Sequence, residues 1–368
     1  MDILSDVLRV VRLSGAVFFS AEFSSPWAIE SPNAELLASF VLPHAECIVL
    51  FHILTEGECF VFCNTHPAVK MKAGDVIIFP HGEPHTMCSH VGVKPSRLDA
   101  VFSQSSPDAT PLVSFGGGGR KARFICGYLN CDQHFNPLIG ALPTMLVVRS
   151  SNDYAMVEAV DEKGTRPAHV SQVSGSWLGT TLKFTINEAK AARPGNGAML
   201  GRLTELMFVE ILRQYMQQSG PGERGWLAGL NDVHIGKVLR LMHANPARSW
   251  TVSQLAREAA ISRSALAERF THLVGESPMR YLAGWRVHLA KQMLRDGNDG
   301  IAEIATRVGY ESEAAFNRAF KRNAGSPPAS WRKCLASVLV SSAALLLCSD
   351  PLTALCSDTL AALSAAAL

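Results

Sequence analysis

The sequence has little that would carry a chain across or into a membrane. Its first fifteen residues hold Asp2 and Asp6, and no basic cluster precedes their apolar residues, so they do not resemble a secretory signal. The apolar stretch Leu335–Leu347 is interrupted by three serines and is short for a membrane span. We therefore expect a cytoplasmic protein with no membrane partner. The composition of the tail, residues 335–368, favours a poorly ordered, low-complexity extension over a hydrophobic anchor.

The sequence also lacks a cysteine framework. Its nine cysteines are an odd number at irregular spacings, and none form a Cys-x-x-Cys pair. A disulfide scaffold and a structural zinc site both need regular spacing, so this pattern argues against either. Small buried side chains are the default interpretation for all nine cysteines.

Charge is scarce and unevenly divided. Charged residues make up 18% of the 368 residues and hydrophobic residues 48%, which is typical of globular chains long enough for two domains. Residues 236–334 hold 16 Lys and Arg against 8 Asp and Glu, a net charge of +8. The remaining 18 basic and 24 acidic residues give −6, so the overall +2 hides a basic module joined to an acidic one. This asymmetry indicates nucleic acid as the partner of the basic module.

The hydrophobic periodicity changes along the chain. Residues 2–13 have the pattern of a short amphipathic helix. From Ala16 to about Arg149, short runs rich in Val, Ile and Phe alternate with Gly and Pro, which is typical of a small β-barrel or sandwich. From Trp177 the period becomes helical, most strongly over Met199–Gln218, and Ser219–Gly222 then predicts a hinge.

Two segments of the basic module repeat one another at an offset of 50 residues. Each has a helix with small residues, a tight turn, a Ser-initiated second helix and then Gly and Pro. The first copy comprises Val252–Ala259, Ser262–Phe270, Gly275–Pro278 and Tyr281; the second comprises Ile301–Val308, Ser312–Phe320, Gly325–Pro328 and Trp331. This order predicts two helix-turn-helix units.

The residue types in each copy fit that geometry. Ser262 and Ser312 can accept hydrogen bonds from the first free amides of the second helices as N-caps. Small residues at Ala256 and Ala305 allow the paired helices to cross closely. Apolar residues four apart form a buried stripe on each second helix. These are Leu266 with Phe270 in the first copy and Phe316 with Phe320 in the second.

The opposite face of each second helix carries side chains that could enter a DNA major groove. They are Arg263, Ser264, Ala267 and Glu268 in the first copy, and Glu313, Ala314, Asn317, Arg318 and Lys321 in the second. Arg318 could pair with a guanine and Asn317 with an adenine. By type and position, Arg322, Arg332, Lys333 and Arg280 are expected to meet phosphates. Two ordinary helical hairpins with solvated charges are the alternative, which the duplication within a basic module disfavours.

Three signatures carry a family resemblance. They are Trp250–Ala256, Met279–Leu282 with Trp285 and Arg286, and Val308–Ser312. With them, residues 236–334 resemble the arabinose-regulator (AraC) family of transcription factors. The resemblance implies that Met279–Leu294, 16 residues and about 24 Å long, is a linker helix holding both units on one face of the duplex. One departure is Ala260, where the family usually has Gly; it would be strained if its φ is positive.

The N-terminal part resembles a cupin barrel. Gly74, Pro80, Gly82 and His85 have the spacing of the second cupin motif, while the first motif is reduced to His52, with Leu54 in place of its second histidine. His52 and His85 could be metal ligands together with Glu56 or His81, or polar residues lining a ligand cavity. The broken His-x-His pair favours the cavity, with no metal and no cofactor.

Cysteines offer a third interpretation of this part. Cys88, Cys126 and Cys131 lie within it, and three basic residues near Cys126 could lower its thiol pKa: Arg120, Lys121 and Arg123. Cys126 and Gly127 resemble the pattern of relatives that sense hypochlorite-type oxidants through cysteines. The N-terminal cysteine of those sensors is missing, with Ala21 near its place. The sensor candidates are therefore His52, His85, Cys88 and Cys126.

Taken together, the sequence predicts an α+β multidomain protein. We expect a cupin-like β-barrel with flanking helices over residues 1–195, a connecting helix and hinge over 196–235, and an all-α tandem helix-turn-helix domain over 236–334. Its expected function is a non-enzymatic transcription regulator, an activator that binds double-stranded promoter DNA and RNA polymerase as a homodimer. A small molecule or an oxidant would control it. The alternative is a cupin-fold metal-dependent enzyme with a helical accessory domain.

Overall fold

A computed structural model describes residues 3–11, 13–34, 36–37, 47–63, 66–97, 112–131, 138–150, 155–161, 164–166, 177–191, 193–218 and 225–334. The chain divides into two compact units. The barrel unit consists of Arg12–Asp132 and Leu142–Pro221. The helical unit consists of Met1–Val11, Gln133–Ala141 and the chain from Gly222 onward.

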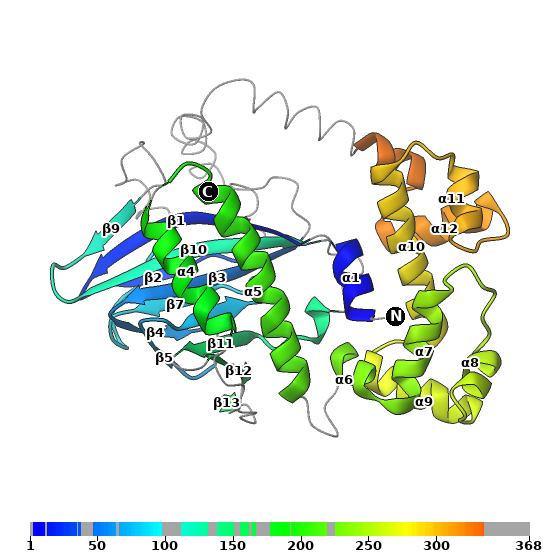
Figure 1. Ribbon diagram of the computed structural model, residues 1–368, viewed down its shortest axis with the longest axis horizontal. Helices are drawn as coiled ribbons and strands as arrows, with labels where there is room; N and C mark the ends of the chain where they lie inside the picture. Colours follow the sequence, from blue (N-terminus) through cyan, green and yellow to red (C-terminus); the bar gives the residue numbers. More distant parts are fainter. Residues whose placement is uncertain are drawn as a thin grey trace. The chain divides into compact units, whose positions relative to one another are not determined.

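The barrel unit is built from two sheets (Figure 1). Its strands are β1 (Ser14–Ser24), β2 (Ala28–Ser31), β3 (Cys47–Glu56), β4 (Glu58–Phe62), β5 (Val69–Lys72), β6 (Val76–Phe79), β7 (His85–Cys88), β8 (Ser96–Arg97), β9 (Leu112–Gly116), β10 (Lys121–Cys131), β11 (Met145–Ser150), β12 (Ala155–Asp161) and β13 (Gly164–Arg166). The larger sheet has the order β13-β12-β11-β6-β3-β10-β1-β9, and the smaller has β5-β4-β7-β2-β8. The predicted strand-rich region and its Val-, Ile- and Phe-rich runs are confirmed.

The core of this unit lies between the two sheets. Because side chains alternate along a strand, Leu50 and Leu54 of β3 point into the core. Phe124 and Cys126 of β10 do the same. The antiparallel register places His52 directly opposite Cys126, so this histidine shares their inward face.

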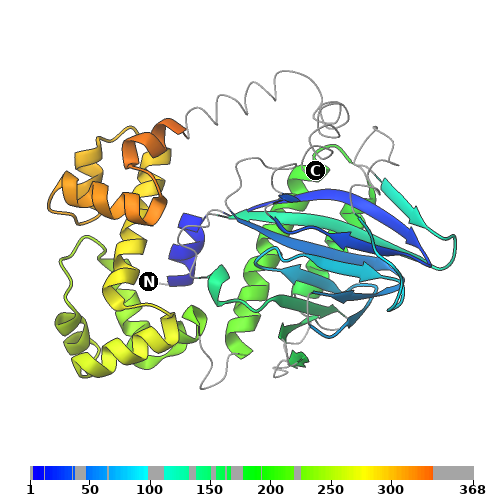
Figure 2. The same cartoon turned by 180° about the vertical axis from the view of Figure 1, so that it is seen from behind.

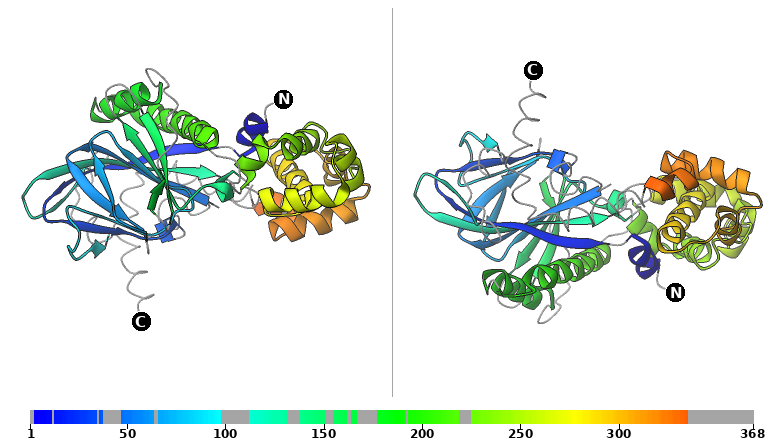
Figure 3. Two further views of the ribbon diagram at one scale, coloured as in Figure 1. Left: turned by 90° about the horizontal axis from the view of Figure 1, so that it is seen from below. Right: turned by 90° about the horizontal axis from the view of Figure 1, so that it is seen from above.

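Two helices, α4 (Trp177–Ala191) and α5 (Asn196–Gln218), lie side by side against one side of the sheets (Figure 3). Figure 2, seen from behind, places the strands in front of them. The backbones of α5 and β1 approach closely, because a Cβ at Gly201 would stand 2.5 Å from the carbonyl oxygen of Gly15. The predicted helix over Met199–Gln218 is confirmed, but it begins earlier. One apolar side chain of this helix, Leu206, is 54% exposed.

The helical unit holds α1 (Ile3–Val11), the short 3-10 helix η1 (Ile139–Ala141) and seven further helices among the described residues. These are α6 (Trp226–Asn231), α7 (Val233–Ala244), α8 (Val252–Glu258), α9 (Arg263–Val274), α10 (Pro278–Asp296), α11 (Ile301–Arg307) and α12 (Glu313–Ala324). The long α10 runs between the α6–α9 group and the α11–α12 pair (Figure 1). Its Val287, Ala290 and Leu294 belong to the core that it shares with α11 and α12.

The boundaries predicted at residues 195, 235 and 334 stay predictions. The described residues of α5 lie within the barrel unit, and the predicted tail, residues 335–368, falls outside the described part of the chain. Within the described ranges, no helix combines the length and the apolar character that crossing a membrane requires.

Candidate functional site

The helices of the two helix-turn-helix pairs, α8 with α9 and α11 with α12, begin where the sequence predicts. Ser262 accepts a hydrogen bond from the amide of Ala265, and Ser312 accepts one from the amide of Ala315. Each serine therefore fixes the first residue of its second helix. The stripes Leu266 with Phe270 and Phe316 with Phe320 are fully buried. Ala256 and Ala305 are buried at the helix crossings.

The turn within each pair needs a left-handed backbone. Ala260 has a φ of +56° and is the one non-glycine residue with positive φ in the described part of the chain. Its counterpart Gly309 has a φ of +91°. The strain expected at Ala260 is thus present, because an L-residue with a Cβ is disfavoured in this conformation.

The predicted groove-facing residues are distributed along the outward faces of α9 and α12. Arg263, Ser264 and Glu268 are exposed on α9, with Ala267 half-buried. Glu313, Ala314, Arg318 and Lys321 are exposed on α12, with Asn317 half-buried. No hydrogen bond or ion pair with another described residue is found for the charged ends of Arg263, Arg318 and Lys321. Their cationic groups therefore face solvent, where a nucleic acid could reach them.

Other basic residues of the helical unit are used inside it. Arg332 is half-buried and donates from Nη2 to the carbonyl oxygen of Asp299 at 2.7 Å. Its guanidinium fastens the loop before α11, so we expect Arg332 to be an internal contact rather than an open phosphate contact. Arg280 pairs with Glu276 at 3.4 Å, so only Arg322 and Lys333 of the expected phosphate contacts keep exposed side chains without an ion pair among the described residues.

A buried polar cluster connects α10 with α6 and α7. Tyr281 accepts a hydrogen bond from Trp226 Nε1 at 2.8 Å, and its hydroxyl lies 2.8 Å from Nε2 of His243. The tautomer of His243 sets which of these two groups donates to the other. Burial lowers the pKa of His243 to about 3. The cluster fixes the start of the linker helix on the scaffold of the first pair.

The interior of the barrel unit holds a chain of three polar side chains. His52 Nδ1 lies 3.0 Å from Cys126 Sγ, and His52 Nε2 lies 2.8 Å from His85 Nε2. His85 Nδ1 lies 2.9 Å from the carbonyl oxygen of Glu83. All three side chains are buried, and the His85 ring stacks on Phe79.

The donor and the acceptor of each of these hydrogen bonds follow from the carbonyl oxygen of Glu83. A carbonyl oxygen only accepts, so His85 donates from Nδ1, and its Nε2 in the neutral ring is an acceptor. His52 must then donate from Nε2 and accept at Nδ1 from the Cys126 thiol. Burial lowers the pKa of His52 well below its ordinary value and that of His85 to about 4, consistent with neutral rings.

This arrangement does not fit a metal centre with three protein ligands. His52 uses one nitrogen toward Cys126 and the other toward His85, so Cys126 and His85 lie on opposite sides of its ring. One ion could not bind all three without turning that ring. The described residues contain no group of three or more His, Cys, Asp or Glu that could hold a metal ion. The alternative of polar residues lining the barrel interior agrees with these contacts.

The expected lowering of the Cys126 pKa is wrong. Burial raises the pKa of its thiol far above the ordinary value. The neighbouring cations cannot oppose this, because they point outward and pair with acids. Lys121 and Arg123 bind Glu22, while Arg120 lies near Glu58. Burial also raises the pKa of Cys88, the other cysteine candidate.

Comparison with known proteins decides the family. Residues 2–162 and 166–217 match the family described as Cupin, and residues 255–334 match the one described as Helix-turn-helix domain. The chain is 44% identical to a putative AraC-like transcription regulator of Streptomyces lividans over 90% of this chain and 98% of the relative. The chain belongs to the AraC-like family of transcription regulators. This confirms the predicted cupin-like and helix-turn-helix fold and favours a regulator over a cupin-fold enzyme.

Two further proteins are similar to parts or most of this chain. A putative AraC-like transcription regulator of Streptomyces antibioticus is 29% identical over 90% of this chain and 99% of its own length. The solved DNA-binding domain of AdpA, in complex with a target DNA, is 28% identical. The match covers 29% of this chain and 96% of that domain, with a TM-score of 0.28.

Sequence reasoning missed several residues that organise this AraC-like chain. Arg286 was noted only as part of a motif, yet it donates to the backbone carbonyls of Pro246 and Arg248 and lies over the Tyr310 ring. It thereby ties α10 to the loop before α8. A signal was available, since an Arg directly after a buried Trp in a helix lies beside the core. The Tyr281–His243 pair gave no such signal, because its members are 38 residues apart.

Proposed function

We propose that this regulator reads a specific DNA site with two helices at once, α9 and α12. The observation that carries the proposal is the duplication of one geometry. Both helices start at a Ser cap, bury an apolar stripe, and expose Arg263 on α9 and Arg318 on α12. The 19 residues of α10 between the pairs correspond to about 28 Å. That length supports recognition helices in successive major grooves.

The contacts divide into two kinds. Arg318 and Asn317 of α12 are proposed to meet base edges, since guanine and adenine offer matching acceptors and donors in the major groove. On α9, Arg263 has this role, while Ser264, Ala267 and Glu268 shape the fit. Glu313, Ala314 and Lys321 do the same on α12. Arg322 and Lys333 are proposed to meet phosphates, which strengthens binding to any sequence.

The test is a salt-titrated gel-shift assay on a site selected from random DNA by the full-length protein. Arg318→Ala should lose about 1–3 kcal/mol on that site and relax preference at one base pair. Lys190→Ala, which removes the same charge from the barrel unit, is the matched control and should bind like the unmodified protein. If both variants lost the same amount of DNA-binding free energy, the loss would come from charge in general, and the proposed base contact of Arg318 would be refuted.

We also propose that the barrel unit senses a small molecule and carries out no catalysis. His52 and His85 direct their nitrogens to each other, to Cys126 and to a backbone carbonyl. These nitrogens are therefore engaged rather than presented to a substrate. The raised pKa of Cys126 favours a small-molecule signal over an oxidant, because a thiolate is the reactive form.

We further propose that the protein forms a homodimer and that it activates transcription through RNA polymerase. Trp177 and Phe184 of α4 are about half exposed, as are Met199 and Leu206 of α5. Each pair is seven residues apart, so each lines one side of its helix. A second copy covering these side chains would explain their exposure. Sedimentation should show a dimer that Phe184→Glu with Leu206→Glu separates; a monomeric unmodified protein would refute this part.

A further inference from the structure

Equivalent positions of α9 and α12 carry opposite charges. The repeat has an offset of 50 residues, so Glu268 of α9 corresponds to Arg318 of α12. Two residues along an α-helix turn through about 200°. Glu268 is two residues from both Leu266 and Phe270, which are fully buried, so it lies on the opposite side of α9 and is exposed. Arg318 has the same relation to the buried stripe of α12. The most outward position of the helix is thus acidic in one unit and basic in the other.

The Glu268 carboxylate is not used inside the helical unit. Among the described residues, no hydrogen bond or ion pair holds its oxygens. The next residue, Arg269, directs its guanidinium to Asp232 instead, with Nε 2.9 Å from a carboxylate oxygen. One turn earlier, the hydroxyl of Ser264 lies 3.1 Å from that of Ser262. Both oxygens of Glu268 are therefore open to a partner that approaches the outward face of α9.

The side chains around Glu268 do not form a phosphate-binding surface. Its neighbours on the face opposite the buried stripe are Ser264, Ala267, Thr271 and His272, with no Lys or Arg among these described residues. The equivalent residues of α12 include two cations and are Ala314, Asn317, Lys321 and Arg322. A carboxylate brought against phosphates would lose its water without gaining a partner. In the major groove it is stabilised only where it accepts a hydrogen bond from a base.

The base edges differ in what they offer to an acceptor. Guanine presents two acceptors in the major groove, and thymine presents an acceptor and a methyl group. Adenine has an amino donor, but its N7 acceptor lies beside it. Cytosine presents its N4 amino group alone, which is the donor that Glu and Asp side chains recognise. Of the four bases, cytosine is therefore the one whose own edge suits a carboxylate without repelling it.

We propose that Glu268 is a specificity-determining residue that accepts a hydrogen bond from the N4 amino group of a cytosine. The same position of the repeat selects cytosine through α9 and guanine through Arg318 of α12. This inference rests on the proposed function, in which the two helices lie in successive major grooves. It also sets the register of the protein on DNA. A protomer displaced by one turn would place Glu268 against the acceptors of that guanine, which repel a carboxylate.

Selection of sites from random DNA by the full-length protein, followed by gel shifts on single base-pair changes, tests this role. The α9 segment of the site is the one that Arg318→Ala leaves unaffected. We expect a cytosine there whose replacement weakens binding about fivefold to a hundredfold. Glu268→Ala should reduce that preference to within about twofold, because no other acceptor replaces the carboxylate. Glu268→Arg should change the selected base to guanine, as Arg318 does.

The control is Glu30→Gln, which removes the same charge from an exposed position of β2 and should select the unmodified site. An α9 segment without a preferred cytosine would overturn the role of Glu268. So would a Glu268→Ala variant that binds every sequence more tightly by the same factor, since that is the behaviour of a solvated acid, or a Glu268→Arg variant that still selects cytosine. If the α12 segment keeps a base preference that Arg318→Ala removes, only this inference fails. If neither segment shows a base preference, the proposed function fails with it.

Discussion

Positions 260 and 309 are equivalent turn positions of the two helix-turn-helix pairs, and both have a left-handed backbone. We expect Ala260→Gly to raise the stability of the helical unit and Gly309→Ala to lower it. Ala260 has a φ of +56°, which costs a residue with a Cβ about 1–2 kcal/mol. Replacing it with Gly removes that strain, while the more flexible unfolded chain offsets about 0.4–1 kcal/mol. Ala260→Gly should therefore stabilise the helical unit by up to about 1.6 kcal/mol. For a unit of this size, that raises its melting temperature by about 4–8 °C per kcal/mol.

The reverse change at Gly309 should be much more damaging. A Cβ there would lie 2.5 Å from both the Cα and the carbonyl oxygen of Ala247, so the backbone must move. Backbone strain and overpacking together predict a loss of about 2–4 kcal/mol for Gly309→Ala. Gly275 separates the two causes, because its φ is +86° but no atom lies within 4 Å of its Cβ position. Gly275→Ala should cost about 1 kcal/mol, from strain alone.

Differential scanning calorimetry of the full-length protein measures all three variants. The transition of the helical unit can be assigned because bound DNA should raise its temperature selectively. The expected order of stability is Ala260→Gly, unmodified protein, Gly275→Ala and Gly309→Ala. A Gly309→Ala variant as stable as Gly275→Ala would refute the predicted clash, and a strongly destabilised Ala260→Gly would refute the strain.

Three further predictions concern His243, Cys126 and Arg332. The pKa of His243 is lowered to about 3 in the folded state, so between pH 6.5 and 3 the unfolded chain binds the extra proton and stability falls as pH falls. Urea unfolding should show about 2 kcal/mol lost from this group between pH 7.5 and 5, and a His243→Gln variant with an undiminished loss would contradict it. Iodoacetamide at pH 7.5 should label the exposed Cys334 at least tenfold faster than Cys126, read by mass spectrometry; equal rates would show an open barrel. Arg332→Ala should lower the stability of the helical unit by about 1–3 kcal/mol without changing the salt dependence of DNA binding, since it removes a bond to Asp299 rather than to a phosphate; a reduced salt slope would restore the phosphate contact.

The helix-turn-helix units could be predicted in detail because their signals are local. A Ser cap, an apolar stripe at a spacing of four, and a turn residue all lie within about twenty residues of one another. Ser262, Ser312 and the strained Ala260 were therefore placed correctly from the sequence alone. Ala260 was recognised because the family that the sequence resembles usually has Gly at this position, as the second copy has at Gly309.

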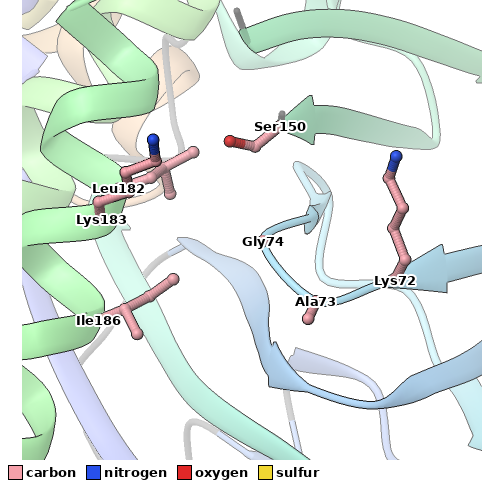
Figure 4. Close-up of a pocket in the computed structure, with 7 residues that line it drawn as sticks. All are labelled: Lys72, Ala73, Gly74, Ser150, Leu182, Lys183 and Ile186. Atoms are coloured by element: carbon pink, nitrogen blue, oxygen red, sulfur yellow. The ribbon is translucent and has the colours of Figure 1, made fainter. Parts of the chain in front are cut away.

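Contacts between distant segments could not be predicted in this way. The partner of Arg332 is a backbone carbonyl 33 residues away, and backbone acceptors leave no trace in the sequence. The error about Cys126 has a similar origin. Lys121 and Arg123 are close in sequence, but strand alternation sends them to the outer face, where Glu22 of β1 binds both. The pocket beside α4 is another example, because its lining comes from α4, from residues 72–74 and from Ser150, which only the fold brings together (Figure 4).

The central claim, that α9 and α12 read one DNA site together, is tested most directly by footprinting. The full-length protein would be bound to a site selected from random DNA and probed with hydroxyl radicals. We expect each protomer to protect two segments on one face of the duplex, about 10 base pairs apart. Arg263→Ala should weaken one segment and Arg318→Ala the other. A single protected segment, or two variants that weaken both segments equally, would contradict the account.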